Sequence, residues 1–238
     1  MFIKELKFLR SVSSHPNIIK FYGITHDPSN GRCKIILQYA NNGNLRAYLK
    51  NNFSKLKWSD KFQMGIEISS GLVFLHDKNI AHRDLHSKNI LVHDGKILIT
   101  DFGLSKRMDE TATYTTANIC GMNAYIDPQC FKNSSYKLDM KSDNYSLGFI
   151  LWEISSGRIP YESFETVQAI FYHVLQGKRE TPLKDSPSKY VQIYEKCWDD
   201  DPSKRPKAKS VLSSLHKLNS NNVHPKPLKP KKDFYINF

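Results

Sequence analysis

The spacing of apolar residues predicts a mixture of helices and strands, with the strands confined to the first hundred residues. Near-helical spacing predicts an amphipathic helix over 2–13 and a long buried helix over 58–79, with a short helix, NLRAYLK, between them. The apolar runs NIIKFYGIT and CKIILQYA, separated by the turn-rich HDPSNGR, predict a β-hairpin. The stretch NILVHDGKILITD predicts a second hairpin that turns at Asp94 and Gly95.

From residue 139 onward the apolar pattern is helical. It predicts four helices, over 139–157, 162–177, 188–200 and 208–219. Because strands come first and helices later, the predicted fold class is α+β. Residues 219–238 mix Asn, Pro and Lys, and we expect a basic, disordered tail there.

Composition narrows the classes of protein. A chain of 238 residues with 39% hydrophobic content can build one domain or two small lobes. The four cysteines lie far apart without a CxxC pair, which argues against a disulfide framework or a zinc site and favours a reducing, cytoplasmic location. No stretch is long and apolar enough to span a membrane, and MFIKELKFLR does not resemble a signal peptide.

The formal net charge of +12 is compatible with nucleic acid, an anionic membrane surface or acidic substrates as partners. The basic residues are scattered, however, and only KPLKPKK forms a run. No nucleic-acid-binding motif accompanies them, so we expect no nucleic-acid partner.

The candidate chemistry lies in IAHRDLHSKNILV, residues 80–92. This stretch joins the long helix to the second hairpin, and that hairpin ends in TDFG, so Asp84, Asn89 and Asp101 are expected around one loop system. Three oxygen-bearing side chains suit Mg²⁺, which prefers few protein ligands together with phosphate oxygens. Either motif alone is typical of a turn, whereas their ordered pairing across a hairpin indicates a reaction centre.

These motifs resemble those of the eukaryotic protein kinases, in the family's order, over about nine tenths of the chain. HRDLHSKN resembles the catalytic loop and DFG the metal-binding motif. HPNIIKFYG resembles the segment after the regulatory helix, YANNGNL resembles the hinge, and YIDPQ resembles the Ala-Pro-Glu element. SDNYSLG resembles the helix with a buried Asp, and CWDDDPSKRP resembles the Trp-and-Arg motif. Several details are most similar to the tyrosine kinases and the tyrosine-kinase-like branch.

The resemblance implies a two-lobe fold in which the partial kinase domain covers 1–218. Residues 1–38 would be a remnant of the small lobe, 39–45 the hinge and 46–218 a mostly helical large lobe. It also implies transfer of the ATP γ-phosphoryl group to a protein hydroxyl, a reaction that depends on positioning and charge neutralisation.

Within that reaction, Asp84 would orient the attacking hydroxyl, Lys88 would supply a cation, and Asn89 and Asp101 would hold Mg²⁺ on the phosphates of ATP. The nucleotide would contact the hinge and its surroundings through Leu37, Gln38, Ala40 and Leu91.

The resemblance also implies regulatory residues. Glu5 would be the regulatory glutamate, and Leu9, Phe21, His82 and Phe102 would form an apolar column anchored by Asp143. Arg83 would bind a phosphate that an upstream kinase places on one of five hydroxyl residues, namely Thr111, Thr113, Tyr114, Thr115 and Thr116.

The chain departs from the family pattern at three positions. Ser/Thr kinases usually have Lys where this chain has His86, and Thr where this chain has Met122. The substrate hydroxyl could therefore belong to Ser/Thr or to Tyr, and the tyrosine-kinase-like character favours Ser/Thr. Gln129 replaces the Glu that pairs with an Arg, here Arg205. We expect the bidentate ion pair to be lost and the large lobe to be less rigid.

No GxGxxG loop and no strand with a catalytic Lys precede Glu5. Three readings are therefore open: a fragment of an active kinase, a pseudokinase that acts as a binding scaffold, or a chain with residual activity. Small-molecule phosphotransferases also use an HxD…N loop, but YIDPQ and SDNYSLG argue against that class. We expect the chain as given to have weak or no activity.

Overall fold

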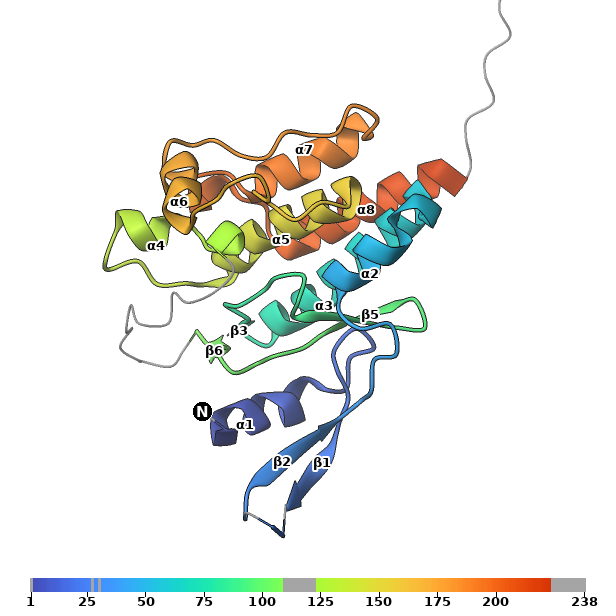
Figure 1. Ribbon diagram of the computed structural model, residues 1–238, viewed down its shortest axis with the longest axis vertical. Coiled ribbons are helices and arrows are strands. Elements are labelled where there is room, and N and C mark those ends of the chain that lie inside the picture. Colours follow the sequence, from blue (N-terminus) through green and yellow to red (C-terminus); the bar gives the residue numbers. More distant parts are fainter. Residues whose placement is uncertain (1, 27, 30, 109–122, 224–238) are drawn as a thin grey trace, which may run out of the picture.

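The computed structural model describes residues 2–26, 28–29, 31–108 and 123–223 (Figure 1). One helix and a two-stranded hairpin lie at one end of the molecule, and a larger helical part lies at the other. The two predicted hairpins and the helices of the second half are present, which confirms the α+β class.

The small end consists of α1 (Phe2–Val12), β1 (Phe21–His26) and β2 (Cys33–Leu37). The two strands are antiparallel, with Phe21 opposite Leu37 and His26 opposite Cys33. Helix α1 buries one apolar stripe, Phe8, Leu9 and Val12, in the main core. Within residues 35–37 of β2, only Ile36 is exposed, because Ile35 and Leu37 pack against that core.

Backbone hydrogen bonds join the small end to the rest of the chain. The Ile19 N–H donates to the Ile99 carbonyl at 2.9 Å, and the Ile99 N–H donates to the Asn17 carbonyl at 2.9 Å. Residues 17–19 therefore continue the sheet of the second hairpin in parallel, although they precede β1. This pairing fixes the small end against the strands that border the catalytic loop.

That second hairpin pairs β4 (Ile90–His93) with β5 (Lys96–Ile99), in the register Ile90 to Ile99. A further pair, β3 (Ile80–Ala81) and β6 (Lys106–Arg107), encloses the catalytic segment and was not predicted. Strands of two residues are too short to show an alternating pattern.

The large lobe is built from helices that pack around α5, as Figure 1 shows. They are α2 (Leu45–Asn52), α3 (Trp58–Asp77), α4 (Gln129–Lys132), α5 (Met140–Ser156), α6 (Val167–Leu175), α7 (Ser188–Cys197) and α8 (Ala208–Val223), with short 3-10 turns η1 (Phe53–Lys55), η3 (Asn123–Tyr125) and η4 (Pro202–Lys204). Every residue from Ser142 to Ser156 is buried. A helix that is buried on all sides forms the centre of a domain rather than its surface.

A glycine permits the close packing of α5 against α7. A Cβ atom at Gly148 would lie 3.0 Å from the carbonyl oxygen of Tyr194, which is tighter than an ordinary contact. One side of α5 is therefore covered by α7, and residues on the other side of α5 can reach the catalytic loop.

The expected tail boundary at residue 219 is wrong. Helix α8 continues to Val223. Its apolar residues, which end with Leu215 and Leu218, pack in the core, where α8 lies along α3. No helix-breaking Gly or Pro follows Leu218 before Pro225. Residues 224–238 lie outside the described part of the chain.

Candidate active site

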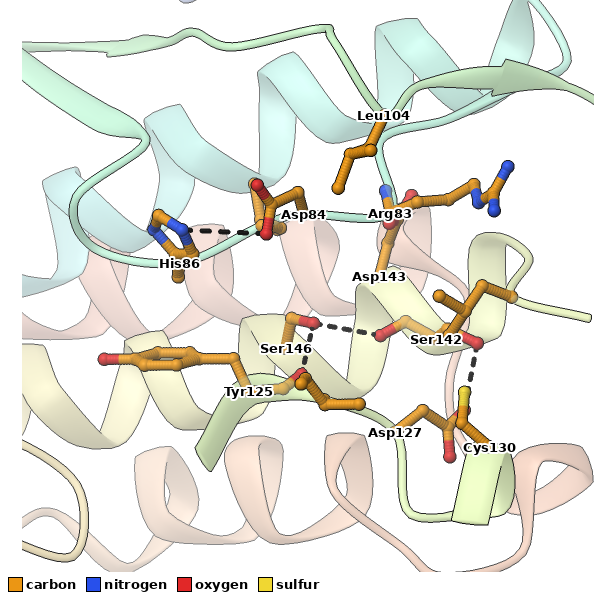
Figure 2. Close-up of a pocket in the computed structure, with 13 residues that line it drawn as sticks. Arg83, Asp84, His86, Leu104, Tyr125, Asp127, Cys130, Ser142, Asp143 and Ser146 are labelled. Carbon is orange, nitrogen blue, oxygen red and sulfur yellow. Dashed lines mark hydrogen bonds and ion pairs between the residues drawn. The ribbon is translucent and has the colours of Figure 1, made fainter. Parts of the chain in front are cut away.

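The catalytic loop places Asp84 and Asn89 in direct contact. The Asn89 side-chain Nδ2 donates to the Asp84 backbone carbonyl at 2.9 Å and to the Asp84 carboxylate Oδ2 at 3.2 Å. His86 lies on the other side of that carboxylate, with Nε2 3.6 Å from Oδ1 (Figure 2). Burial is the main reason that the pKa of His86 lies below its ordinary value; the charge of Asp84 opposes this effect. Lys88 is exposed.

Asp143, at the start of α5, holds the loop from beneath. Its carboxylate accepts hydrogen bonds from the backbone N–H groups of His82 at 2.9 Å and Arg83 at 2.8 Å, and it contacts Nε2 of His76 at 2.9 Å. Arg83 has a φ of 71°, a left-handed conformation that a residue other than glycine rarely adopts. The hydrogen bonds to Asp143 stabilise this conformation and so position the following residue, Asp84.

Two of the four residues of the expected apolar column are in ring-to-ring contact. The rings of His82 and Phe102 are both fully buried, with centroids 5.3 Å apart. Leu9 of α1 is buried in the same core, and Phe21 of β1 is partly buried against it. The hydrophobic pattern of the helix and strand thus brings all four into one apolar core.

The second hairpin brings the two expected magnesium ligands to one place. Asn89 directly precedes β4, Asp101 follows β5, and the Thr100 N–H donates to the Asn89 carbonyl at 3.0 Å. Asp101 is exposed and has a φ of 64°, whereas Phe102 beside it is buried. A carboxylate and an amide oxygen form the kind of donor pair that Mg²⁺ takes together with phosphate oxygens, so these residues fit the ion.

The hinge has backbone groups suited to a purine. The Gln38 N–H donates to the Lys20 carbonyl at 2.9 Å, and the Ala40 carbonyl accepts a backbone N–H three residues further on. These bonds leave the Gln38 carbonyl and the Ala40 N–H as the groups that could bind adenine. Leu37 and Leu91 are both half-buried beside this segment.

Glu5 of α1 lies near Asp101. Burial raises the pKa of Glu5, and the negative charge of Asp101 raises it further. The two carboxylates repel each other where the family has a strand lysine that pairs with the regulatory glutamate.

Comparison with known proteins identifies the family. The sequence model described as protein tyrosine and serine/threonine kinase matches residues 1–215. The chain belongs to the protein kinase family. It is 32% identical over 222 residues to the probable serine/threonine-protein kinase drkA of Dictyostelium discoideum, which covers 92% of this chain and 33% of drkA. It is 31% identical over 205 residues to the serine/threonine/tyrosine-protein kinase HT1 of Arabidopsis thaliana, which covers 85% of this chain and 51% of HT1.

The kinase chain spans about a third of the length of the first curated relatives that it matches, 33% of drkA and 31% of drkB, a second probable serine/threonine-protein kinase of Dictyostelium discoideum. Among the residues that the structure describes, no helix combines the length and the apolar character needed to cross a membrane.

Arg205 of the kinase large lobe has a bidentate carboxylate partner at position 127, whereas the family pattern places that partner at position 129. Arg205 donates to Asp127, with Nη1 2.5 Å from Oδ2 and Nη2 2.9 Å from Oδ1, and both side chains are fully buried. Gln129 instead donates to the backbone carbonyl of Asp200 at 2.8 Å. Gln129 thus does not form the bidentate pair, as expected, but Arg205 pairs with Asp127, which points inward from the turn before α4; this partner was not predicted.

A second buried network was not predicted. Glu153 of α5 accepts hydrogen bonds from Ser87 at 3.0 Å, from Arg46 of α2 at 3.2 Å and from the Tyr125 hydroxyl. Burial is the main reason that the pKa of Glu153 is raised; its hydrogen-bond donors oppose that effect. The network connects the catalytic loop to three other elements. No local pattern marks it, because Arg46 and Glu153 are 107 positions apart.

The five expected phosphorylation sites and Met122 lie outside the described residues. Thr111, Thr113, Tyr114, Thr115 and Thr116 therefore stay predictions, as does the phosphate-binding role of Arg83.

Proposed function

We propose that this chain carries the catalytic half of a protein kinase that transfers the γ-phosphoryl group of ATP to a serine or threonine hydroxyl of a protein. The observation that carries the proposal is the contact of Asp84 with Asn89 above the Asp143 anchor. A carboxylate held in this way accepts a hydrogen bond from an attacking hydroxyl without a change in its own geometry. Several relatives are serine/threonine-protein kinases by name, which supports serine and threonine as substrates.

Asn89 and Asp101 would hold Mg²⁺, which neutralises negative charge on the phosphates when it is bound. Asp84 orients the hydroxyl, and Lys88 projects into solvent at the mouth of the loop, where its ammonium group can approach a phosphate. The ring contact of His82 with Phe102 is buried, whereas Asp101 beside it is exposed and could reach the ion.

The test is phosphotransfer from radiolabelled ATP to a general protein substrate by residues 1–238, compared with the Asp84→Asn variant. We expect slow transfer by the parent chain and none by the variant, because neither a Gly-rich loop nor a strand lysine occurs in these residues to position the phosphates. Joining the first small-lobe strands of a close relative ahead of Met1 should raise the rate. If Asp84→Asn in that fusion keeps full activity, the proposed role of Asp84 is wrong.

A non-catalytic scaffold is the alternative function. The repulsion between Glu5 and Asp101 supports it, because two carboxylates without a lysine between them bind ATP phosphates poorly. Calorimetric titration with ATP and Mg²⁺ separates the two functions. Binding that is lost in Asp101→Asn favours the kinase, whereas a folded chain that binds no nucleotide favours the scaffold.

A further inference from the structure

His86 occupies a buried position beside the reacting carboxylate. Its side chain is 11% exposed and lines a cavity of about 60 Å³ together with Asp84 and Tyr125. The rings of His86 and Tyr125 meet edge to face, with centroids 6.1 Å apart. Figure 2 shows the imidazole turned toward Asp84.

The backbone determines which nitrogen of this imidazole carries hydrogen. The Asn89 N–H is shared between the His86 carbonyl oxygen at 2.9 Å and His86 Nδ1 at 3.1 Å. A backbone N–H can only donate, so a hydrogen on Nδ1 would point at another hydrogen. The ring therefore accepts at Nδ1 and carries its hydrogen on Nε2.

The Nε2–H group faces Asp84. Nε2 lies 3.6 Å from Oδ1, while Asn89 Nδ2 donates to Oδ2 at 3.2 Å. The carboxylate thus has a donor on each side. The distance to His86 is slightly longer than a hydrogen bond, as is common for catalytic contacts that shorten when substrate binds.

We propose that His86 is a positioning residue of the phosphotransfer reaction, whose Nε2–H fixes the orientation of the Asp84 carboxylate. This inference rests on the proposed function. A lysine at this position would place a flexible cation near the carboxylate. His86 instead offers one neutral donor in a fixed direction, set by Asn89. With a donor on each side, the carboxylate of Asp84 would keep its remaining lone pairs for the hydroxyl of the substrate.

Two substitutions of similar size separate the two ring nitrogens. His86→Asn keeps an acceptor near the position of Nδ1 but has no group that reaches Asp84. His86→Gln extends an amide N–H to about the position of Nε2. Loss of a contact that aligns a catalytic group costs about 10–100-fold in rate. We expect kcat to fall by about that factor in His86→Asn, with KM for ATP unchanged, and to be largely retained in His86→Gln.

Nuclear magnetic resonance tests the contact without requiring turnover. In residues 1–238 with labelled histidine, the His86 ring should show hydrogen on Nε2, and Asp84→Asn should shift its Nε2 signal. The carboxyl carbon signal of Asp84 should move in His86→Asn and stay near its parent position in His86→Gln. Hydrogen on Nδ1, or an Asp84 signal that ignores both substitutions, would overturn the proposal, as would unchanged kcat in His86→Asn. Turnover is measured in the fusion that carries the small-lobe strands of a relative; a fusion without any turnover would instead count against the proposed function, while the spectra still decide the contact.

Discussion

Replacing Asp127 by alanine tests the buried ion pair that connects the turn before α4 to the end of the large lobe. The substitution leaves the Arg205 guanidinium fully buried with no carboxylate partner. Removing one member of a buried, hydrogen-bonded ion pair typically costs about 3–5 kcal/mol. For a chain of this size, each kcal/mol corresponds to about 2–4 °C, so we expect the Tm to fall by about 6–20 °C.

Gln129→Ala is the matched control, because it removes the residue that the family pattern would place opposite Arg205. Its side chain is only partly buried and makes a hydrogen bond to a backbone carbonyl. The expected loss is about 1 kcal/mol. Urea unfolding of both variants, followed by circular dichroism, measures the difference. If Asp127→Ala is no more destabilising than Gln129→Ala, the ion pair does not stabilise the lobe and the argument from burial is refuted.

The pH dependence provides an independent check on the same pair. Burial raises the pKa of Asp127, but the hydrogen bonds and charge of Arg205 outweigh it, so the net pKa lies below its ordinary value. A carboxylate whose pKa is lower in the folded state contributes stability above its unfolded pKa of about 4 and loses it as the pH falls through the folded value. The difference between the parent and Asp127→Ala should therefore be constant from about pH 5 to 8 and shrink in stronger acid. A difference that grows on acidification would contradict this account.

Three further predictions concern other parts of the chain. Glu5→Gln should raise the Tm at pH 7, because it removes repulsion from Asp101. The gain in Tm should vanish below about pH 4, where the Glu5 carboxyl of the parent is protonated. An equal gain at both pH values would show that charge is not the cause. Tyr125→Phe should lower the free energy of unfolding, measured in urea, by about 1–3 kcal/mol, because Glu153 loses a buried hydrogen-bond donor. An unchanged free energy of unfolding would mean that Ser87 and Arg46 are sufficient donors for Glu153. Amide hydrogen exchange should be fast in β1 and β2, which form a two-stranded sheet, and slow in the buried half of α1; equal protection of both would refute this ordering.

The sequence by itself determined the local elements and the grouping of the candidate site residues around one hairpin. The periodic spacing of apolar residues involves residues that are close in the sequence. Both hairpins and the helices α3 and α5 could therefore be predicted from this spacing alone. In the sequence, a hairpin lies between HRDLHSKN and DFG. This order was enough to indicate that Asn89 and Asp101 come together, because the two ends of a tight hairpin lie side by side.

Only the tertiary structure decided which side chains meet across the domain. Asp127 and Gln129 are two residues apart, and the sequence does not state which one points at Arg205; the direction of each side chain depends on the turn before α4 and its packing on α5. The Glu153 network joins residues 66 and 107 positions apart, and the donor direction of His86 depends on the fold of the loop around Asn89. Hydrophobic periodicity records which face of an element is buried, whereas the partner of a buried polar group is set by the packing of distant elements.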